Sequence, residues 1–519
     1  MFHYRNPRTK DNPLKSRRQR VVVFIHGWSV TNLNTYGELP LRLRDEAKKE
    51  GTDIVLKEIF LGRYISFHDE VRLADISRAF HTAVKDQLAD LLKDGSRFVC
   101  ITHSTGGPVI REWFDAYYGD GSTICPMSHL IMLAPANHGS ALAQLGKGRV
   151  GRLKSWFEGV EPGQGVLDWL ELGSAGAWQL NRKWIAGGEE HIKTSRLFPF
   201  VLTGQAIDRK FYDALNTYTG EIGSDGVVRV AAANLRSRYV RLVQPKPRKV
   251  RRGNLVTGDL VIEEYKEAPL SALRILARTS HSGTEMGIMA SVKRNAKENR
   301  ETVQAILACI KVQNTEDYDS LCRRFEAETE TVQGRELVEI EKRILLSDRV
   351  FIHDRFSMVI FKVTDTAGQP VQDFDLVLTA GRKNDPNHLP EGFAPDRQRN
   401  RVHPNTITYY FNYDIMRGTK ATKDPTNKRV IRKQLEGIDR LGIIVKPRPD
   451  RGFVHYVPCK IEATKELLDK ALVPNSTTLV DISLQRIVDK EVFRLERIAK
   501  DTMPTVDFKN TNPSGRSTE

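Results

Sequence analysis

Ser104 is the residue of this sequence whose setting best suits a nucleophile. It stands in RFVCITHSTGGPVIREW, after an apolar run that predicts a buried strand and before an apolar-periodic run that predicts a helix. A serine between a strand and a helix sits on a strained turn, so its hydroxyl stands clear of the sheet. Gly106 is small, as this turn requires, whereas the β-branched Thr102 fits less easily. The alternative is a Ser-Thr-Gly-Gly turn that caps a helix.

Two residues farther along the chain are candidates to activate this hydroxyl. A serine is a poor nucleophile at neutral pH and needs an adjacent base, which a carboxylate in turn orients. Asp225 stands in SDGVV and His281 in SHSG, each after an apolar run. Serine, acid, histidine is one of the chain orders in which such triads occur.

A glycine-containing turn upstream is a third feature of chemical interest. The apolar run Val21–Ile25 ends in HGWS. A glycine at this place lets the backbone bend so that an N–H faces the negative charge that develops in acyl transfer. We expect the N–H groups of Trp28 and Thr105 to form this oxyanion hole. A plain strand-to-loop turn is the alternative interpretation.

Other histidines and acids compete for the same roles. His26, His103 and His138 also lie in segments near the predicted site. We expect His103 to be a packing or hydrogen-bonding residue, and His138 precedes the candidate acid, which fits the chain order poorly. Asp208 and Asp213 are alternative acids, for which a helix cap or a solvated face is the simpler interpretation.

The elements that must position these residues alternate between apolar strands and amphipathic helices. This alternation predicts βαβ units and a mostly parallel sheet flanked by helices. The expected strands are Val21–Ile25, Ile54–Leu61, Arg97–His103, His129–Ala134, Leu197–Thr203 and Ala272–Arg278, and the expected helices are Leu73–Leu92, Gly107–Tyr118 and Gly283–Ile310.

The pattern changes after about residue 330. Residues 331–345 predict a charged connecting helix, and short β-rich runs separated by turns follow it. Their alternation by twos is typical of a β-sandwich. We therefore expect four parts: a basic arm (1–20), an α/β catalytic domain (21–330), a β-rich accessory domain (345–500) and a disordered tail (501–519).

Together, FIHGW, THSTGG, SDGVV and SHSG resemble the motifs of α/β-hydrolases of the bacterial lipase and esterase kind, over roughly residues 20–310. The resemblance implies the α/β-hydrolase fold, with Ser104 as nucleophile, His281 as general base and Asp225 as the acid that orients it. Thr102 departs from the family's usual glycine at that position. The implied reaction is acyl transfer through an acyl-enzyme.

Tryptophans gather between two expected core strands, at about residues 140–190, where this fold often carries a lid. Four of the six tryptophans lie there, beside further apolar side chains. One interpretation is a mobile lid over an acyl-chain pocket, with Trp156, Phe157, Trp169 and Trp178 facing substrate. The other is that these aromatics pack a cap subdomain.

Charge is the least ordinary property of the composition. Lys and Arg exceed Asp and Glu by 80 to 65, a net charge of +15. Basic residues cluster at Arg8–Arg20 and in KPRKVRR, on a hairpin inserted at about 246–266. Such a cluster favours an anionic membrane by about 1 kcal/mol per residue, although a solvated loop is the alternative. Nucleic acid is not expected, since no RNP, zinc-finger or aromatic-basic motif occurs.

These features predict a lipase or phospholipase that acts on membrane glycerophospholipids. The N-terminus lacks an apolar signal core, which predicts synthesis in the cytoplasm. The resemblance extends to phospholipase effectors of type VI secretion, which implies delivery to a target cell's envelope and an immunity or delivery partner. No cofactor is expected, with calcium left open. The alternatives are a cytosolic esterase or thioesterase, and a non-catalytic membrane- or nucleic-acid-binding protein on a hydrolase fold.

Overall fold

The structure is a computed structural model of the whole chain. It describes residues 19–26, 35–65, 70–145, 163–207, 221–246, 248–249, 255–256, 258–297, 300–341, 348–426 and 428–488. Several predictions fall outside these residues: those on Trp28, Trp156, Phe157, Asp208 and Asp213, on almost all of the basic arm 1–20, and on the tail 501–519.

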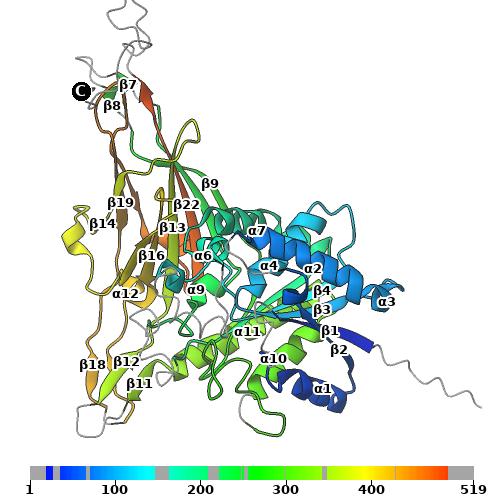
Figure 1. Cartoon of the computed structure of the whole chain (residues 1–519). Coiled ribbons are helices and arrows are strands. Elements are labelled where there is room, and N and C mark those ends of the chain that lie inside the picture. Colours follow the sequence, from blue (N-terminus) through cyan, green and yellow to red (C-terminus); the bar gives the residue numbers. More distant parts are fainter. Residues whose placement is uncertain are drawn as a thin grey trace, which may run out of the picture.

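A six-stranded parallel sheet forms the centre of the N-terminal part, as the alternating pattern predicts (Figure 1). Its strand order is β10-β5-β4-β3-β1-β2. The strands are β1 (Gln19–His26), β2 (Asp53–Phe60), β3 (Phe98–His103), β4 (Met127–Leu133), β5 (Phe198–Thr203) and β10 (Ala272–Ile275). Since all strands point the same way, their carboxyl ends meet at one edge, where this fold places its site.

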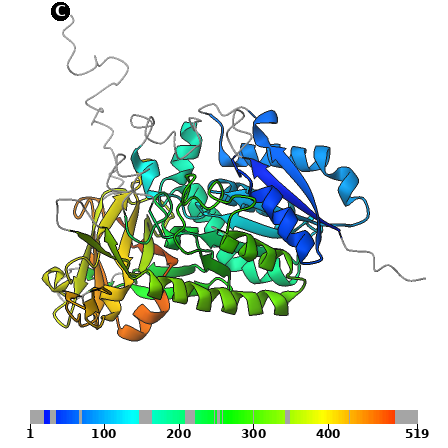
Figure 2. The ribbon, with the colours of Figure 1, turned by 90° about the horizontal axis from the view of Figure 1, so that it is seen from below.

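Helices cover both faces of this sheet, and β1 shows how. Val21 and Val23 belong to one core cluster and Val22 and Phe24 to the other, as alternating side chains must. The first cluster contains residues of α2 (Leu73–Gln87), α4 (Gly106–Tyr118), α6 (Gln164–Leu170) and α7 (Ala175–Lys193), and the second contains residues of α1 (Leu39–Lys49), α10 (Arg300–Ile310) and α11 (Thr315–Arg335). Seen from below, α11 runs along its face toward the C-terminal strands (Figure 2).

Two predicted helices are wrong. Among the described residues of the expected helix Gly283–Ile310, only 300–310 are helical. Gly283 has φ 108° and the Ile288 N–H donates to Ser280 O, which folds the segment back. In place of a helix over 331–345, α11 ends at Arg335 and β11 (Val338–Glu341) pairs with β12 (Arg349–Ile352). The sequence VEIE alternates by twos, which suits a strand.

A second six-stranded sheet forms the middle layer of the molecule. Its order is β15-β16-β13-β22-β6-β9. Along β13, Met358 and Ile360 join the core of the parallel sheet's helices, whereas Val359 and Phe361 pack on the three-stranded sheet β14-β19-β21. The strands are β6 (Arg238–Val243), β9 (Val261–Glu267), β13 (Phe356–Asp365), β14 (Phe374–Ala380), β15 (Asp396–Arg399), β16 (Thr406–Asn412), β19 (Leu441–Pro447), β21 (Cys459–Ala463) and β22 (Ser476–Leu484).

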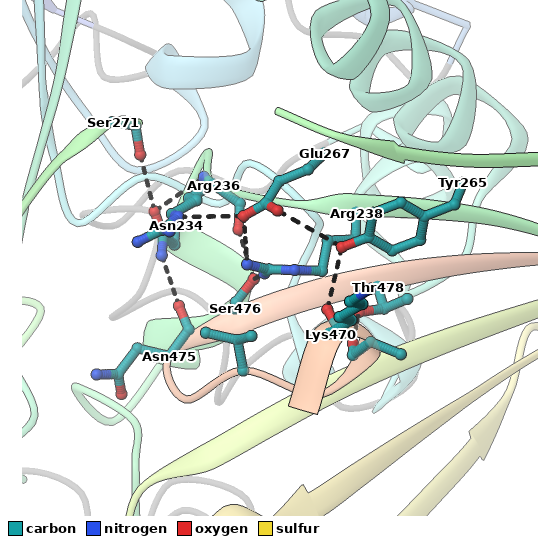
Figure 3. A network of polar contacts seen from close by, with 12 residues as sticks. Asn234, Arg236, Arg238, Tyr265, Glu267, Ser271, Lys470, Asn475, Ser476 and Thr478 are labelled. Carbon is teal, nitrogen blue, oxygen red and sulfur yellow. Dashed lines mark hydrogen bonds and ion pairs between the residues drawn. The ribbon is translucent and has the colours of Figure 1, made fainter. Parts of the chain in front are cut away.

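Strands β6 and β9 of this sheet lie between the candidate acid and the candidate base in the chain. β6 pairs with β22 in parallel, and a polar network fixes the junction (Figure 3). The Asn234 side chain donates to Asn475 O at 2.7 Å, and Arg238 donates to Ser476 Oγ at 2.9 Å and to Glu267 Oε1 at 2.6 Å. The segment that carries the acid therefore continues directly into the C-terminal sheet.

The inserted basic segment forms two short strands, β7 (Arg248–Lys249) and β8 (Leu255–Val256), at the end of the C-terminal sheets far from α1 (Figure 1). The remaining elements are η1 (Leu61–Arg63), α3 (Ala89–Leu92), η2 (Ala141–Leu145), α9 (Val230–Ala233), η5 (Pro386–His388), α12 (Tyr413–Arg417), β17 (Thr422–Lys423), β18 (Val430–Arg432), β20 (Val454–His455), α13 (Lys465–Ala471) and β23 (Ile487–Val488). Within the described ranges, no helix is both long and apolar enough to cross a membrane.

Candidate active site

Ser104 occupies a strained turn between β3 and α4. Its φ is +53°, in the left-handed region that residues other than glycine rarely adopt. The Ser104 N–H donates to Leu133 O of β4 at 2.9 Å, and Ser104 O accepts from Gly107 N at 3.2 Å. Backbone strain of this kind persists only where the surroundings enforce it, and it is common at functional sites.

Thr102 explains why glycine is required at position 106. Thr102 is fully buried, and a Cβ added to Gly106 would overlap Thr102 Oγ1, well inside the 3.0 Å that a Cβ atom needs. The resemblance would place a glycine at this position, and this chain has Thr102 there instead. A Cβ on Gly107 would likewise come within 2.7 Å of Pro135 Cβ, so the turn depends on both glycines.

Gly106→Ala is expected to lower the free energy of unfolding by about 3 kcal/mol, because the new methyl group overpacks the turn. Ester hydrolysis falls with it as the serine moves. The double variant Thr102→Gly/Gly106→Ala removes the overlap and restores both properties. Thermal melting and ester hydrolysis, with Thr102→Gly as control, measure the effect. A Gly106→Ala protein with unchanged stability and rate would contradict this account of the turn.

The structure brings Ser104, His281 and Asp225 together in a chain of hydrogen bonds. His281 Nε2 lies 3.1 Å from Ser104 Oγ, and His281 Nδ1 lies 2.9 Å from Asp225 Oδ2. Asp225 and His281 are fully buried, while Ser104 keeps 9% of its surface exposed. A serine in contact with a histidine that a carboxylate orients is the arrangement of an acyl-transfer nucleophile.

The loop around Asp225 holds its carboxylate by the oxygen that His281 does not use. Asp225 Oδ1 accepts from Val227 N at 3.0 Å and from Val228 N at 2.8 Å. Gly226, with φ 95°, makes the tight turn that aims these N–H groups back. A buried carboxylate needs such partners, and here both oxygens have them.

The segment of His281 is fixed by close backbone approach. A Cβ on Gly204, just after β5, would overlap Thr279 O, so only glycine lets β5 and the histidine segment meet. The His281 N–H also donates to Asp225 O at 2.9 Å. The base and the acid are thus joined through the backbone as well as through their side chains.

The competing histidines have other partners. His103 Nε2 lies 3.2 Å from His281 O, which confirms the hydrogen-bonding role of His103. Burial and, to a smaller extent, the nearby His281 lower the pKa of His103 well below the usual range. His138 Nε2 lies 2.8 Å from Ser237 Oγ, and burial lowers the pKa of His138 to about 3. His26 stacks on Phe60 with ring centroids 4.2 Å apart.

Thr105 is the N-cap residue of α4 and directly follows the candidate nucleophile. This is the position from which an N–H serves an oxyanion, and the helix dipole adds to its positive field. Its predicted partner in the oxyanion hole, Trp28, lies outside the described residues.

The two described tryptophans of the predicted substrate set pack against the protein itself. Trp178 of α7 is buried in the first core cluster, with Lys362 Nζ of β13 at 5.4 Å from its ring centroid. Trp169 of α6 is half-buried, and its ring lies where a Cβ on Gly176 would fall. The placement of both residues is that of side chains that pack a cap.

Arg229 is a residue near the site that sequence reasoning missed. It is buried four residues after Asp225 and contacts Glu221 and, from the C-terminal sheet, Asp396 and Tyr410. The available signal was a single charge inside the apolar run VVRVAAA, where a side chain can be buried only if it is paired. In the described part of the chain, no cluster of three or more His, Cys, Asp or Glu residues could hold a metal ion.

Comparison with solved structures finds similarity along almost the whole chain. The chain is 43% identical to "Phospholipase PlaB from Legionella pneumophila", with a TM-score of 0.79, covering 93% of this chain and 97% of that one. A second PlaB structure, "in complex with thio-NAD", gives 41% identity, a TM-score of 0.80 and the same coverage. The chain matches no protein-family model, and a comparison with curated proteins finds no match.

Proposed function

The chain belongs to the α/β-hydrolase phospholipase family that includes PlaB of Legionella pneumophila, and from this we propose that it hydrolyses membrane glycerophospholipids. It is a carboxylic ester hydrolase of the lipase and phospholipase type, with a lipid substrate. The observation that carries the proposal is the hydrogen-bond chain from Ser104 through His281 to Asp225, in a protein so similar to a phospholipase.

In the proposed reaction, Ser104 Oγ attacks the ester carbonyl carbon while His281 Nε2 takes the hydroxyl proton. Asp225 keeps Nδ1 protonated and stabilises the imidazolium that forms. His281 then returns the proton to the leaving lyso-lipid oxygen, and an acyl-enzyme remains. Water repeats the sequence, which releases the fatty acid and regenerates the serine.

The oxyanion forms beside the turn that carries Ser104. Support for the Thr105 N–H as one donor comes from its place at the N-terminus of α4, where donors fixed in advance lower the barrier most. Removing one such donor typically slows acyl transfer by about 10²–10³-fold. The Trp28 N–H is proposed as the second donor from its sequence context alone.

We expect the purified protein to release fatty acid from phospholipid vesicles, and to do so faster as their anionic content rises. The first result follows from a lipid substrate and the second from the net charge of +15. Fatty-acid release from neutral and anionic vesicles is compared with hydrolysis of a short-chain aryl ester, with Ser104→Ala as the inactive control. A parallel set with NAD tests whether a nicotinamide dinucleotide, related to the ligand of one PlaB structure, changes the rate.

The outcomes separate the candidate functions. Hydrolysis of the aryl ester without release from any vesicle would favour a small-ester esterase and overturn the phospholipase proposal. Equal rates on neutral and anionic vesicles would leave the reaction in place and overturn the role of the basic charge. A charge effect should also weaken as salt is added, because exposed charges are screened.

A further inference from the structure

We propose that Arg229 is a positioning residue for Asp225, through which the C-terminal sheet completes the active site. The inference rests on the proposed role of Asp225 as the triad acid. It is drawn from five contacts that Arg229 and its neighbours make with residues of β13, β15 and β16, far downstream in the chain.

Arg229 joins the loop of the acid to the C-terminal sheet. Its Nε and Nη2 donate to the two carboxylate oxygens of Glu221, each at 2.7 Å. Nη2 also forms an ion pair with Asp396 of β15, and the guanidinium carbon lies 4.1 Å from the ring centroid of Tyr410 of β16. The Arg229 side chain is 2% exposed, so these contacts are sheltered from water.

Tyr410 holds the start of the same loop from the other direction. Its hydroxyl lies 3.2 Å from Ile222 O and 3.1 Å from Gly223 O. Gly223 has φ 78°, and a Cβ there would overlap the Tyr410 hydroxyl, so this contact requires a glycine. The Tyr410 ring stacks on Phe356 of β13 at 4.4 Å, which fixes its own position.

The charges in this cluster depend on one another. Burial alone would lower the pKa of Arg229, but the carboxylates of Glu221 and Asp396 raise it, so the guanidinium stays charged. Removing one partner from a buried group of charges leaves the others uncompensated, which strongly destabilises the arrangement. The loop therefore has a defined position only while both carboxylates are in place.

The loop transmits this position to Asp225. Residues 223–230 close on themselves through Val230 N–H to Gly223 O, at 2.9 Å, and through a bridge between Ser224 and Arg229. Asp225 lies within this closed loop. Arg229, near one end of the loop, and Tyr410, which contacts the other end, connect it to the C-terminal sheet. Catalysis is sensitive to such support, since a displacement of about 1 Å can reduce a rate about a hundredfold.

A matched pair of aspartates tests the proposal. Asp396→Asn weakens the contact with Arg229, and we expect kcat on a soluble aryl ester to fall by roughly ten- to a hundredfold while KM changes little. Asp414→Asn is the control: Asp414 pairs with Arg355 at 2.6 Å, and Arg355 lies over the Tyr413 ring, but none of these residues contacts the acid loop in the described structure. Rates are expressed per mole of folded protein.

A double-mutant cycle separates positioning from general stability. If Arg229 acts through Asp225, then Arg229→Met slows the wild-type enzyme but changes little in the Asp225→Asn background. Arg229→Lys, which keeps the charge, should recover part of the rate that Arg229→Met loses. A fluorogenic ester keeps the residual rates measurable.

Three results would overturn the proposal: unchanged kcat in Asp396→Asn, an equal loss in Asp414→Asn, or Arg229→Met effects that simply add to those of Asp225→Asn. Failure of the proposed function gives different results: Ser104→Ala would hydrolyse the ester as fast as the wild type, or the wild type would hydrolyse the ester without releasing fatty acid from vesicles. The two failures are therefore distinguishable in one set of assays.

Discussion

Ser104→Ala is expected to lower kcat for ester hydrolysis by about 10⁶-fold, the loss found when the nucleophile of another serine hydrolase triad is removed. Ser104 Oγ is the atom that forms the acyl-enzyme, and it lies 3.1 Å from His281 Nε2. Alanine leaves His281 no side-chain oxygen to activate at this position. The fold should tolerate the change, because alanine is smaller and the serine is partly exposed at the site. Steady-state rates on an aryl ester and thermal melting measure the two properties.

Ser77→Ala is the matched control. Ser77 is also buried, on α2, and its hydroxyl has no partner in the described structure, so its removal should leave kcat unchanged. A fluorophosphonate should label wild type and Ser77→Ala but not Ser104→Ala. Labelling of Ser104→Ala at another serine, with retained turnover, would contradict the assignment of the nucleophile.

Asp225→Asn is expected to lower kcat by about 10⁴-fold with little change in KM, the loss known for the same change in another serine hydrolase triad. The structure explains why the loss should be so large. The asparagine oxygen would keep the Val227 and Val228 N–H groups, so its NH₂ would face His281 Nδ1. An imidazole that accepts at Nδ1 carries its proton on Nε2 and cannot take one from Ser104.

Asp365→Asn provides the control for this change. Asp365 is a buried aspartate of the C-terminal sheet, and its Oδ1 likewise accepts two backbone N–H groups, from Ala367 and Gln369, both at 2.9 Å. Both substitutions should lower the melting temperature, but only Asp225→Asn should affect kcat. A similar loss of kcat in both variants, or in neither, would contradict the role of Asp225.

Local sequence patterns predicted the parts of the fold that local rules govern. Apolar runs placed the strands of the parallel sheet to within a few residues, because a strand buried on both faces must be apolar throughout. The order of Ser104, Asp225 and His281 predicted a group that the structure brings within hydrogen-bond distance. Chain order carries this information because the fold returns each strand end to one edge of the sheet.

Long-range pairing explains what the sequence did not reveal. The helical spacing of residues 283–299 is real, but Gly283 and Gly287 turn the chain back on the histidine segment. In the sequence, Arg229 resembles a solvated loop charge. The partners that allow its burial, Asp396 and Tyr410, come from the distant C-terminal sheet. β6 and β9 have ordinary strand patterns that do not specify which sheet they join. Calcium, an immunity partner and delivery by a secretion system stay predictions.

If the C-terminal sheet positions Asp225 as proposed, the pairing of β6 with β22 also bears on when during synthesis the enzyme can become active. Arg238 lies opposite Thr478 in this pair, so the ribosome must complete the strand at 476–484 before β6, which already has β9 on one side, gains its second neighbour. At about 5–20 residues per second, that interval is roughly 10–50 s of synthesis. Throughout this interval, at least one of Asp396, Tyr410 and β22 has still to be synthesised. On the proposal that the C-terminal sheet positions Asp225, a nascent chain would therefore gain its catalytic geometry only after that sheet has been synthesised.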